Sequence, residues 1–189
     1  MTESEALEAL KYAGKLNPGP WIAHSLNVGH AARLITQKTA EYDPEKAYVY
    51  GILHDIGRRY GFSHIKHTLD GYKYLGDTEI KAAYICLSHS FPNKNIEEYQ
   101  GEMDLPESEL TKIKELLKEY QYDYYDQLIQ LCDSLCSAEG FVQMEVRWVD
   151  VAIRNGINDF IIQKWKKIRE IKSSFNKRYS INIDHLLEI

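Results

Sequence analysis

The sequence predicts an all-α protein built as a single domain over residues 1–189. Apolar residues recur three and four positions apart along most of the chain, and no segment alternates polar and apolar residues as a half-buried strand would. The length fits one domain at about 100–200 residues per domain. With 44% apolar residues, 11 glycines and 5 prolines, the composition is that of a globular protein that can bury its own core.

Breakers and capping residues divide the first half of the chain into helices. The breaker Asn17-Pro18-Gly19-Pro20 ends the first helix and separates it from the second. Asp43 and Pro44 then supply an N-cap and a first-turn proline for the third. The helices of this half are predicted over about 3–15, 20–40, 44–59, 65–76 and 78–90.

Residues 91–104 show no helical periodicity and contain Pro92, Asn93, Asn95 and Gly101. An irregular segment of this length in a compact domain is usually functional or mobile, so we expect it to act as a lid. Periodicity then resumes, and the remaining helices are predicted over about 106–120, 126–137, 144–155, 158–175 and 183–188.

Acidic residues outnumber basic ones, 28 to 23, which gives a net charge of −5. We therefore expect no general affinity for nucleic-acid polymers or anionic membranes. The basic residues between Lys164 and Lys172 share a helix with an apolar stripe that includes Ile161 and Ile168. We interpret them as a solvent-exposed face of that helix.

The sequence gives no sign of a membrane segment or a disulfide framework. No apolar run approaches the roughly 20 residues that cross a bilayer, and the first five residues are acidic where a signal peptide would be basic. A cytoplasmic location is the expectation. Cys86, Cys132 and Cys136 are odd in number and match no CxxC zinc spacing, so we expect buried, reduced thiols.

Several histidines and aspartates fall on helix faces that the pattern turns inward. His24 shares its face with Val28 and Ile35, whereas His30 does not and is assigned to the surface. His54 and Asp55 lie in an apolar frame. A buried aspartate must be paired, hydrogen-bonded or bound to a metal, and the adjacent histidine is a natural second ligand.

Two further residues repeat this pattern. Asp133 interrupts the nearly continuous apolar stretch 128–135, and His89 ends an apolar helix on its inward side. A single histidine on an apolar face is more often a core residue than a ligand, so the argument depends on the set.

The set resembles the HD-domain family of metal-dependent phosphohydrolases, whose signature is a histidine, an adjacent His-Asp pair and a distant aspartate on separate helices. Leu53-His54-Asp55-Ile56-Gly57-Arg58-Arg59 is similar to the family's Leu-His-Asp-Ile-Gly-Lys/Arg block. His67 followed by Gly71 resembles the next His-xxx-Gly turn, and Ile85 to His89 resembles an Ile-xxx-His segment. The resemblance implies an HD-domain helical bundle with its motif-bearing core at about 20–140 and additional C-terminal helices at about 141–189.

The resemblance also implies a ligand set. One divalent ion would be held by His24, His54, Asp55 and Asp133. In relatives that carry two further histidines, the aspartate of the His-Asp pair bridges two ions. The resemblance then implies that Asp55 bridges two ions here and that His67 and His89 complete the second site. Both histidines are present, which favours two ions over one, although His64 could in principle replace His67. The ligand types suit iron, manganese, cobalt, nickel or zinc and do not select among them.

Four other residues are candidates for contact with substrate. Arg58 and Arg59 follow the His-Asp pair as candidate catalytic and substrate-binding residues, because a guanidinium can neutralise a phosphate. The alternative for each is a helix end favoured by the macrodipole. Lys94 in the expected lid is a weaker phosphate ligand or an exposed loop lysine. Gln130 either faces substrate or makes a core hydrogen bond.

The function implied by the resemblance is a metal-dependent phosphohydrolase that acts on a small phosphorylated substrate, with a nucleotide favoured. The order of motif residues is most similar to bacterial HD-type hydrolases of dinucleoside polyphosphates. Two alternatives stay open. One is a di-iron oxygenase of the same fold, and the other is a non-catalytic, nucleotide-binding regulatory protein.

Overall fold

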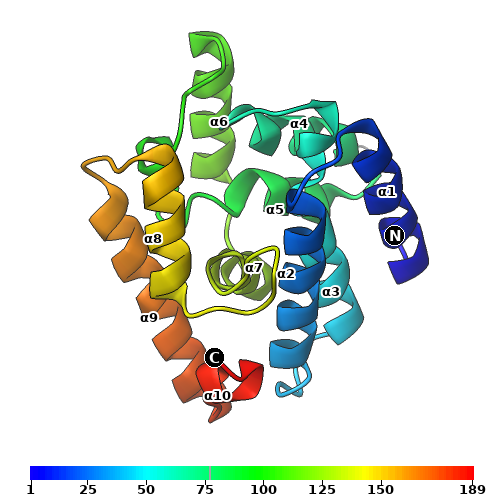
Figure 1. Cartoon of the computed structure of the whole chain (residues 1–189), viewed down its shortest axis with the longest axis vertical. Coiled ribbons are helices and arrows are strands. Elements are labelled where there is room, and N and C mark those ends of the chain that lie inside the picture. Colours follow the sequence, from blue (N-terminus) through cyan, green and yellow to red (C-terminus); the bar gives the residue numbers. More distant parts are fainter. Residues whose placement is uncertain (77) are drawn as a thin grey trace.

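The computed structural model describes residues 1–76 and 78–189, and this part of the chain is all-α, as predicted (Figure 1). It contains no strand apart from an isolated antiparallel bridge between Cys136 and Phe141. None of the helices described combines the length and the apolar composition needed to cross a membrane. The elements are α1 (Glu3–Leu16), α2 (Trp21–Thr36), α3 (Pro44–Leu53), the 3-10 helix η1 (Ile56–Tyr60), α4 (Lys66–Leu75), α5 (Ile80–Ser88), the 3-10 helix η2 (Ile96–Glu98), α6 (Glu107–Glu119), α7 (Tyr124–Ser134), α8 (Met144–Asn155), α9 (Ile161–Tyr179) and α10 (Ile183–Leu187).

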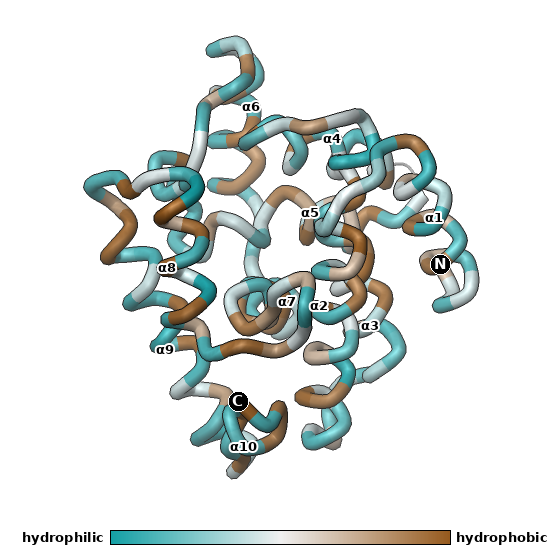
Figure 2. Tube along the Cα trace, viewed as in Figure 1, coloured by the Kyte–Doolittle hydropathy of each residue, from teal (hydrophilic) through white to brown (hydrophobic). Residues whose placement is uncertain are grey.

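Helix α7 lies at the centre of the molecule and contacts α2, α3, α5, α8 and α9 (Figure 1). Leu128, Ile129, Leu131 and Cys132 are completely buried. The apolar side chains of α7 pack against its neighbours, and the buried polar side chains of Asp126 and Gln130 make hydrogen bonds to α5. The outer helices bury only one face, and brown and teal segments alternate along most of them in Figure 2.

The third helix is shorter than predicted. It ends at Leu53, the chain turns through His54 and Asp55, and residues 56–60 form a separate 3-10 helix. The cause is a contact with α4, which follows later in the chain. Gly57 packs so closely on α4 that a Cβ there would lie 2.0 Å from the carbonyl oxygen of His67. The prediction of one continuous helix to residue 59 was therefore wrong.

Helices α2 and α3 cross at a pair of glycines. A Cβ added to Gly51 would lie 2.5 Å from the Cα of Gly29, so the two backbones are in direct contact. This close approach brings the inward faces of both helices together, and the ring centroids of His24 and His54 are 5.2 Å apart.

Residues 91–104 are packed, although the sequence shows no periodicity there. Phe91, Ile96 and Tyr99 are buried in one cluster with Leu110 and Ile113 of α6. Irregularly spaced apolar residues anchor the segment over the neighbouring helices, and its expected role as a lid stays a prediction.

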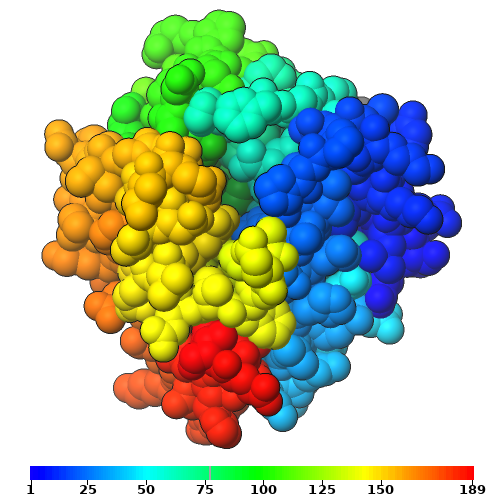
Figure 3. All heavy atoms as spheres, in the orientation of Figure 1, coloured from blue at the N-terminus to red at the C-terminus, as the bar shows by residue number. Residues whose placement is uncertain are grey.

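Helices α8 and α9 pack against α7, and the loop between them contacts the segment 91–104. The side chains of Trp148 and Trp165 stack with ring centroids 5.3 Å apart and join α8 to α9. Asn158 donates a hydrogen bond of 2.8 Å to the carbonyl of Tyr99, and Gln100 donates one of 3.2 Å to the carbonyl of Gly156. Figure 3 shows a hollow in this face of the molecule between α8 (gold), α2 (blue) and the teal residues near α4.

Candidate metal centre

Five buried side chains converge from four parts of the fold to form two overlapping groups. In the first, ligand atoms of His24, His54 and Asp55 all lie within 4.8 Å of one another. In the second, the same holds for Asp55, His67 and His89. Asp55 belongs to both groups, so the structure brings together these predicted residues from α2, the turn after α3, α4 and the end of α5.

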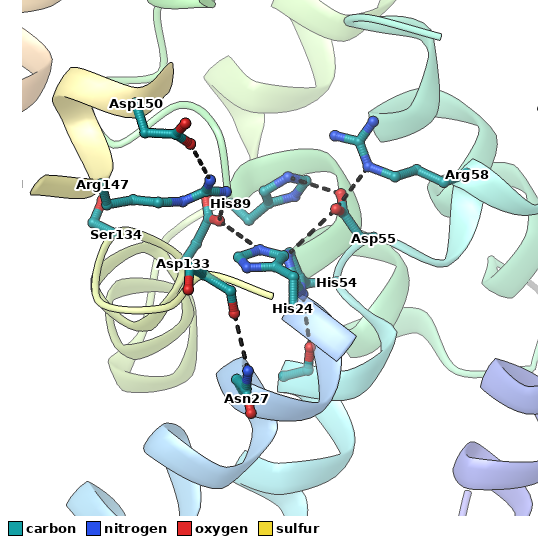
Figure 4. A network of polar contacts seen from close by, with 12 residues as sticks. His24, Asn27, His54, Asp55, Arg58, His89, Asp133, Ser134, Arg147 and Asp150 are labelled. Carbon is teal, nitrogen blue, oxygen red and sulfur yellow. Dashed lines mark hydrogen bonds and ion pairs between the residues drawn. The ribbon is translucent and has the colours of Figure 1, made fainter. Parts of the chain in front are cut away.

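Asp133 reaches the first group through His24. Its Oδ1 lies 3.0 Å from Nε2 of His24, a contact between residues 109 positions apart (Figure 4). Asp133 is not a member of either close group of ligand atoms, and its side chain is 28% exposed. It therefore lies at the open edge of the cluster.

Backbone carbonyls orient three of the four imidazoles. Nδ1 of His54 lies 2.7 Å from the carbonyl oxygen of Gly51, and Nδ1 of His89 lies 2.8 Å from that of Cys86. Nδ1 of His67 contacts the carbonyl oxygen of His64 in the same way. A carbonyl can only accept, so each Nδ1 carries the proton and each neutral ring keeps its Nε2 lone pair.

The same contact resolves the choice between His64 and His67. His64 contributes its backbone carbonyl, whereas the imidazole of His67 joins the second group of ligand atoms. His64 and His67 are three residues apart, about one helical turn, so the carbonyl of His64 lies next to the imidazole of His67.

The directed lone pairs fit a metal. Nε2 of His67 lies 3.1 Å from Oδ1 of Asp55, yet neither atom carries a proton to place between them. Nε2 of His54 and Oδ1 of Asp55 are buried without any hydrogen-bond partner among the described residues. Buried polar atoms are almost always satisfied, and a cation among these atoms would satisfy them together.

The electrostatics of the cluster favour the forms that bind metals. Burial lowers the pKa of His24 and of His67, and burial together with His54 lowers the pKa of His89 to about 3. Burial would raise the pKa of Asp55, but Arg58, His54 and His67 outweigh it and hold that pKa well below its usual value. His24, His67 and His89 are therefore neutral and Asp55 is ionised near neutral pH.

Arg58 lies beside the cluster, as predicted. Its Nε donates a hydrogen bond of 2.7 Å to Oδ2 of Asp55. Its terminal nitrogens make longer contacts, at 3.3 Å to the carbonyl of Ser63 and 3.4 Å to Nε2 of His67. These contacts are near the limit of a hydrogen bond, so both nitrogens can still donate to another group.

Arg59 does not join the cluster. Its guanidinium lies 3.9 Å from the ring centroid of Tyr74 and also near Tyr12 and Tyr60. A 3-10 helix has three residues per turn, so adjacent side chains point about 120° apart. The two arginines that the sequence offers as candidates for contact with substrate therefore point in different directions, and only Arg58 lies beside the cluster.

Lys94 and Gln130 are engaged elsewhere. Nζ of Lys94 donates a hydrogen bond of 2.6 Å to the carbonyl of Tyr120, at the end of α6. Gln130 is buried, and its Nε2 donates a hydrogen bond of 3.1 Å to the carbonyl of Ser88, next to His89. The structure thus gives Lys94 no place at the cluster and gives Gln130 a supporting position behind it.

Two residues near the cluster, and a third on a helix that packs against α7, were not identified from the sequence. Tyr99 is buried, and its ring centroid is 6.2 Å from that of His67. Arg147 of α8 places Nη2 4.0 Å from Oδ1 of Asp133. Lys164 of α9 was assigned to a solvent-exposed face but is partly buried. None of the three belongs to a motif, and only the irregular segment around Tyr99 gave a signal.

One comparison with known proteins gives a match. The family model described as the HD domain matches residues 21–138, which is more than half of the chain. No curated protein and no solved structure matches the chain.

Proposed function

The chain belongs to the HD domain family, and from this premise we propose that it is a metal-dependent phosphohydrolase acting on a small phosphorylated substrate. The observation that carries the proposal is the pair of ligand groups that share Asp55. The Nε2 lone pair of His67 faces a carboxylate oxygen of Asp55, and Nε2 of His54 and Oδ1 of Asp55 have no hydrogen-bond partner among the described residues, so bound cations would satisfy these atoms together.

The residues divide into two sets of ligands. His24, His54, Asp55 and Asp133 would hold one ion, and Asp55, His67 and His89 would hold the second. The mixed imidazole and carboxylate donors suit iron, manganese, cobalt, nickel or zinc. Such a pair of ions supplies a water that is ionised near neutral pH and two positive charges for the phosphate oxygens.

Side chains around the metal ligands would bind the phosphate and exclude water. Arg58 keeps Nε on Asp55 and directs Nη1 and Nη2 to a phosphate oxygen, where a charge-assisted bond stabilises developing negative charge. Tyr99 is buried against the ring of His67 and keeps bulk water from that side. No side-chain nucleophile is required in this arrangement.

For the substrate we infer a nucleotide, with a dinucleoside polyphosphate as the specific candidate. The order of the histidines and aspartates supports this choice, because it is similar to that of bacterial HD-type hydrolases of these compounds. The net charge of −5 supports a small substrate met by local cations rather than a nucleic-acid polymer.

The test begins with protein purified without chelator, followed by metal analysis and a phosphate-release screen over nucleotides with and without oxygen. We expect bound transition metal and oxygen-independent release of phosphate. Turnover that requires iron and oxygen would instead identify an oxygenase. Tight nucleotide binding without turnover would identify a regulatory protein.

Asp55→Ala is the decisive variant, because Asp55 is the one residue shared by both groups of ligand atoms. We expect it to lose bound metal and phosphate release together. His30→Ala is the matched control, since His30 lies on α2 like His24 but is exposed. Retained metal with normal turnover in Asp55→Ala would contradict the proposal.

A further inference from the structure

We propose that Arg147 of α8 and Lys164 of α9 form a second phosphate-binding subsite on the Asp133 side of the metal centre, so that the preferred substrate carries more than one phosphate. The inference rests on the proposed function and assigns residues of α8 and α9 to a second phosphate of its substrate. Both helices lie outside residues 21–138, the part of the chain that the family model matches.

Arg147 reaches the edge of the cluster from α8. Figure 4 shows its guanidinium between Asp133 and Asp150, on the opposite side of the histidines from Arg58. Nη2 lies 4.0 Å from Oδ1 of Asp133, and Nη1 lies 3.4 Å from Oδ2 of Asp150. The side chain of Arg147 is 18% exposed, so the group is largely withdrawn from solvent but open on one side.

These contacts leave donors of Arg147 free for an anion. A separation of 4.0 Å is too long for a hydrogen bond and 3.4 Å is near the limit, although a guanidinium has five N–H donors. If Asp133 serves as a ligand, its charge is shared with a cation and compensates Arg147 less. Arg147 then keeps only the exposed Asp150 as an uncommitted counter-charge, and a phosphate would provide a second one.

Lys164 adds a second positive charge from another helix. Helix α9 packs on η2, which carries the buried side chain of Glu98. Burial lowers the pKa of Lys164, while the carboxylates of Asp133 and Glu98 act in the opposite direction. Among the described residues, Nζ of Lys164 has no hydrogen-bond or ion-pair partner. Lys164 therefore lies on a helix that packs against α7, which carries Asp133, and its Nζ is available to an anion.

The positions of Arg58 and Arg147 favour a substrate with more than one phosphate. Arg58 is bonded to Asp55 on one side of the cluster, and Arg147 lies against Asp133 on the other (Figure 4). One phosphate that contacts Arg58 cannot also use the cations on the far side. A chain of phosphates can use both, so discrimination by phosphate number follows from the placement of the cations.

Binding of two non-hydrolysable probes tests the subsite without relying on turnover. Isothermal titration calorimetry on manganese-loaded protein would compare methylphosphonate, with one phosphonate group, and methylenediphosphonate, with two. In Arg147→Gln and in Lys164→Gln we expect the affinity for methylenediphosphonate to fall about tenfold, as for loss of a charge-assisted hydrogen bond. The affinity for methylphosphonate should change less than about twofold, because Arg58 and the ions remain.

Arg169→Gln and Lys166→Gln are matched controls, since both residues are exposed on α9. Neither should change the preference between the two probes. Arg147→Lys retains the charge and should recover part of the lost affinity. Metal content and thermal melting of each variant would show that the centre and the fold are intact.

The outcomes separate the subsite from the proposed function. Equal affinity losses for both probes, or no loss for methylenediphosphonate, would overturn the subsite even if the protein releases phosphate from nucleotides. A loss confined to methylenediphosphonate would support the subsite even if no nucleotide is hydrolysed, in which case the proposed function alone would fail.

Discussion

At the scale of single residues, backbone carbonyls determine how the histidines can act. The carbonyl three residues earlier fixes the tautomer of His54, His67 and His89, and their Nε2 lone pairs face Asp55 or its neighbours. Such supporting bonds orient a metal ligand and raise its basicity. The histidine side chains are thus prepared for ligation by hydrogen bonds that the protein makes on its own.

The second ion depends on His67 and His89. We expect His67→Ala or His89→Ala to lower the metal content from two ions toward one and to depress the rate of phosphate release. The exposed residues His30 and His185 supply the controls, and alanine at either should change neither quantity. Metal analysis together with steady-state kinetics checks this. Unchanged stoichiometry and kinetics in both variants would leave only the four-ligand site.

The lowered pKa of His89 predicts acid sensitivity of the metal-free protein. His89 stays neutral in the folded state down to a pKa of about 3, whereas its pKa in the unfolded chain is about 6.5. Between these values the unfolded state binds more protons, so stability rises with pH through this window and is lost as the pH falls.

Urea unfolding of the metal-free protein at pH 5.0 to 6.5 would measure this dependence. One such histidine contributes a slope of up to about 1.4 kcal/mol per pH unit. His24 and His67 act in the same direction, since burial lowers the pKa of each. We expect a shallower slope in His89→Gln, and an unchanged slope would disprove the role of His89.

At the scale of the elements, the crossing of α2 and α3 sets the distance between the first two histidines. A Cβ at Gly51 would collide with the backbone of Gly29, which cannot move aside without separating the helices. A Cβ at Gly14 would instead meet the end of the Ile22 side chain, at 2.7 Å, and that side chain can rotate.

We therefore expect Gly51→Ala to reduce the free energy of unfolding by about 1–3 kcal/mol, as overpacking does, and to weaken metal binding by displacing His24 from His54. Gly14→Ala should leave metal binding unchanged and have the smaller effect on stability. Urea unfolding and metal titration of the two variants make the comparison. Equal effects would show that the crossing does not control the site.

At the scale of the whole molecule, the candidate ligands join helices that are far apart in the chain. Asp133 lies on the central helix α7, and the others come from α2, the turn after α3, α4 and the end of α5. An ion bound by such a set stabilises the folded state because the unfolded chain does not present the same site.

Removal of metal should consequently lower the melting temperature. A ligand at 100 times its Kd contributes about 2.7 kcal/mol, which for a domain of this size corresponds to a shift of about 5–10 °C. Thermal melting with and without a chelator would measure the shift. Asp55→Ala should melt at one temperature in both conditions, whereas a chelator effect of equal size in that variant would place the stabilising ion elsewhere.

The sequence by itself determined the helical class and the residues that could form a metal site. Helical periodicity identifies buried faces, so it placed His24 inward and His30 outward, and both assignments are confirmed. It also singled out Asp55 and Asp133, because an acid within an apolar frame needs a partner. These signals are local, and a local pattern is readable without knowledge of the fold.

Only the tertiary structure decided how the chain bends and which cations reach the cluster. The turn after α3 depends on contact between Gly57 and His67, and that turn sends Arg58 and Arg59 in different directions. Arg147 approaches Asp133 from α8, and Lys164 lies on α9, which packs against the helix of Asp133, yet neither belongs to a motif. Contacts between distant residues leave no periodic trace in a sequence, because packing between elements, rather than spacing within one, brings the residues together.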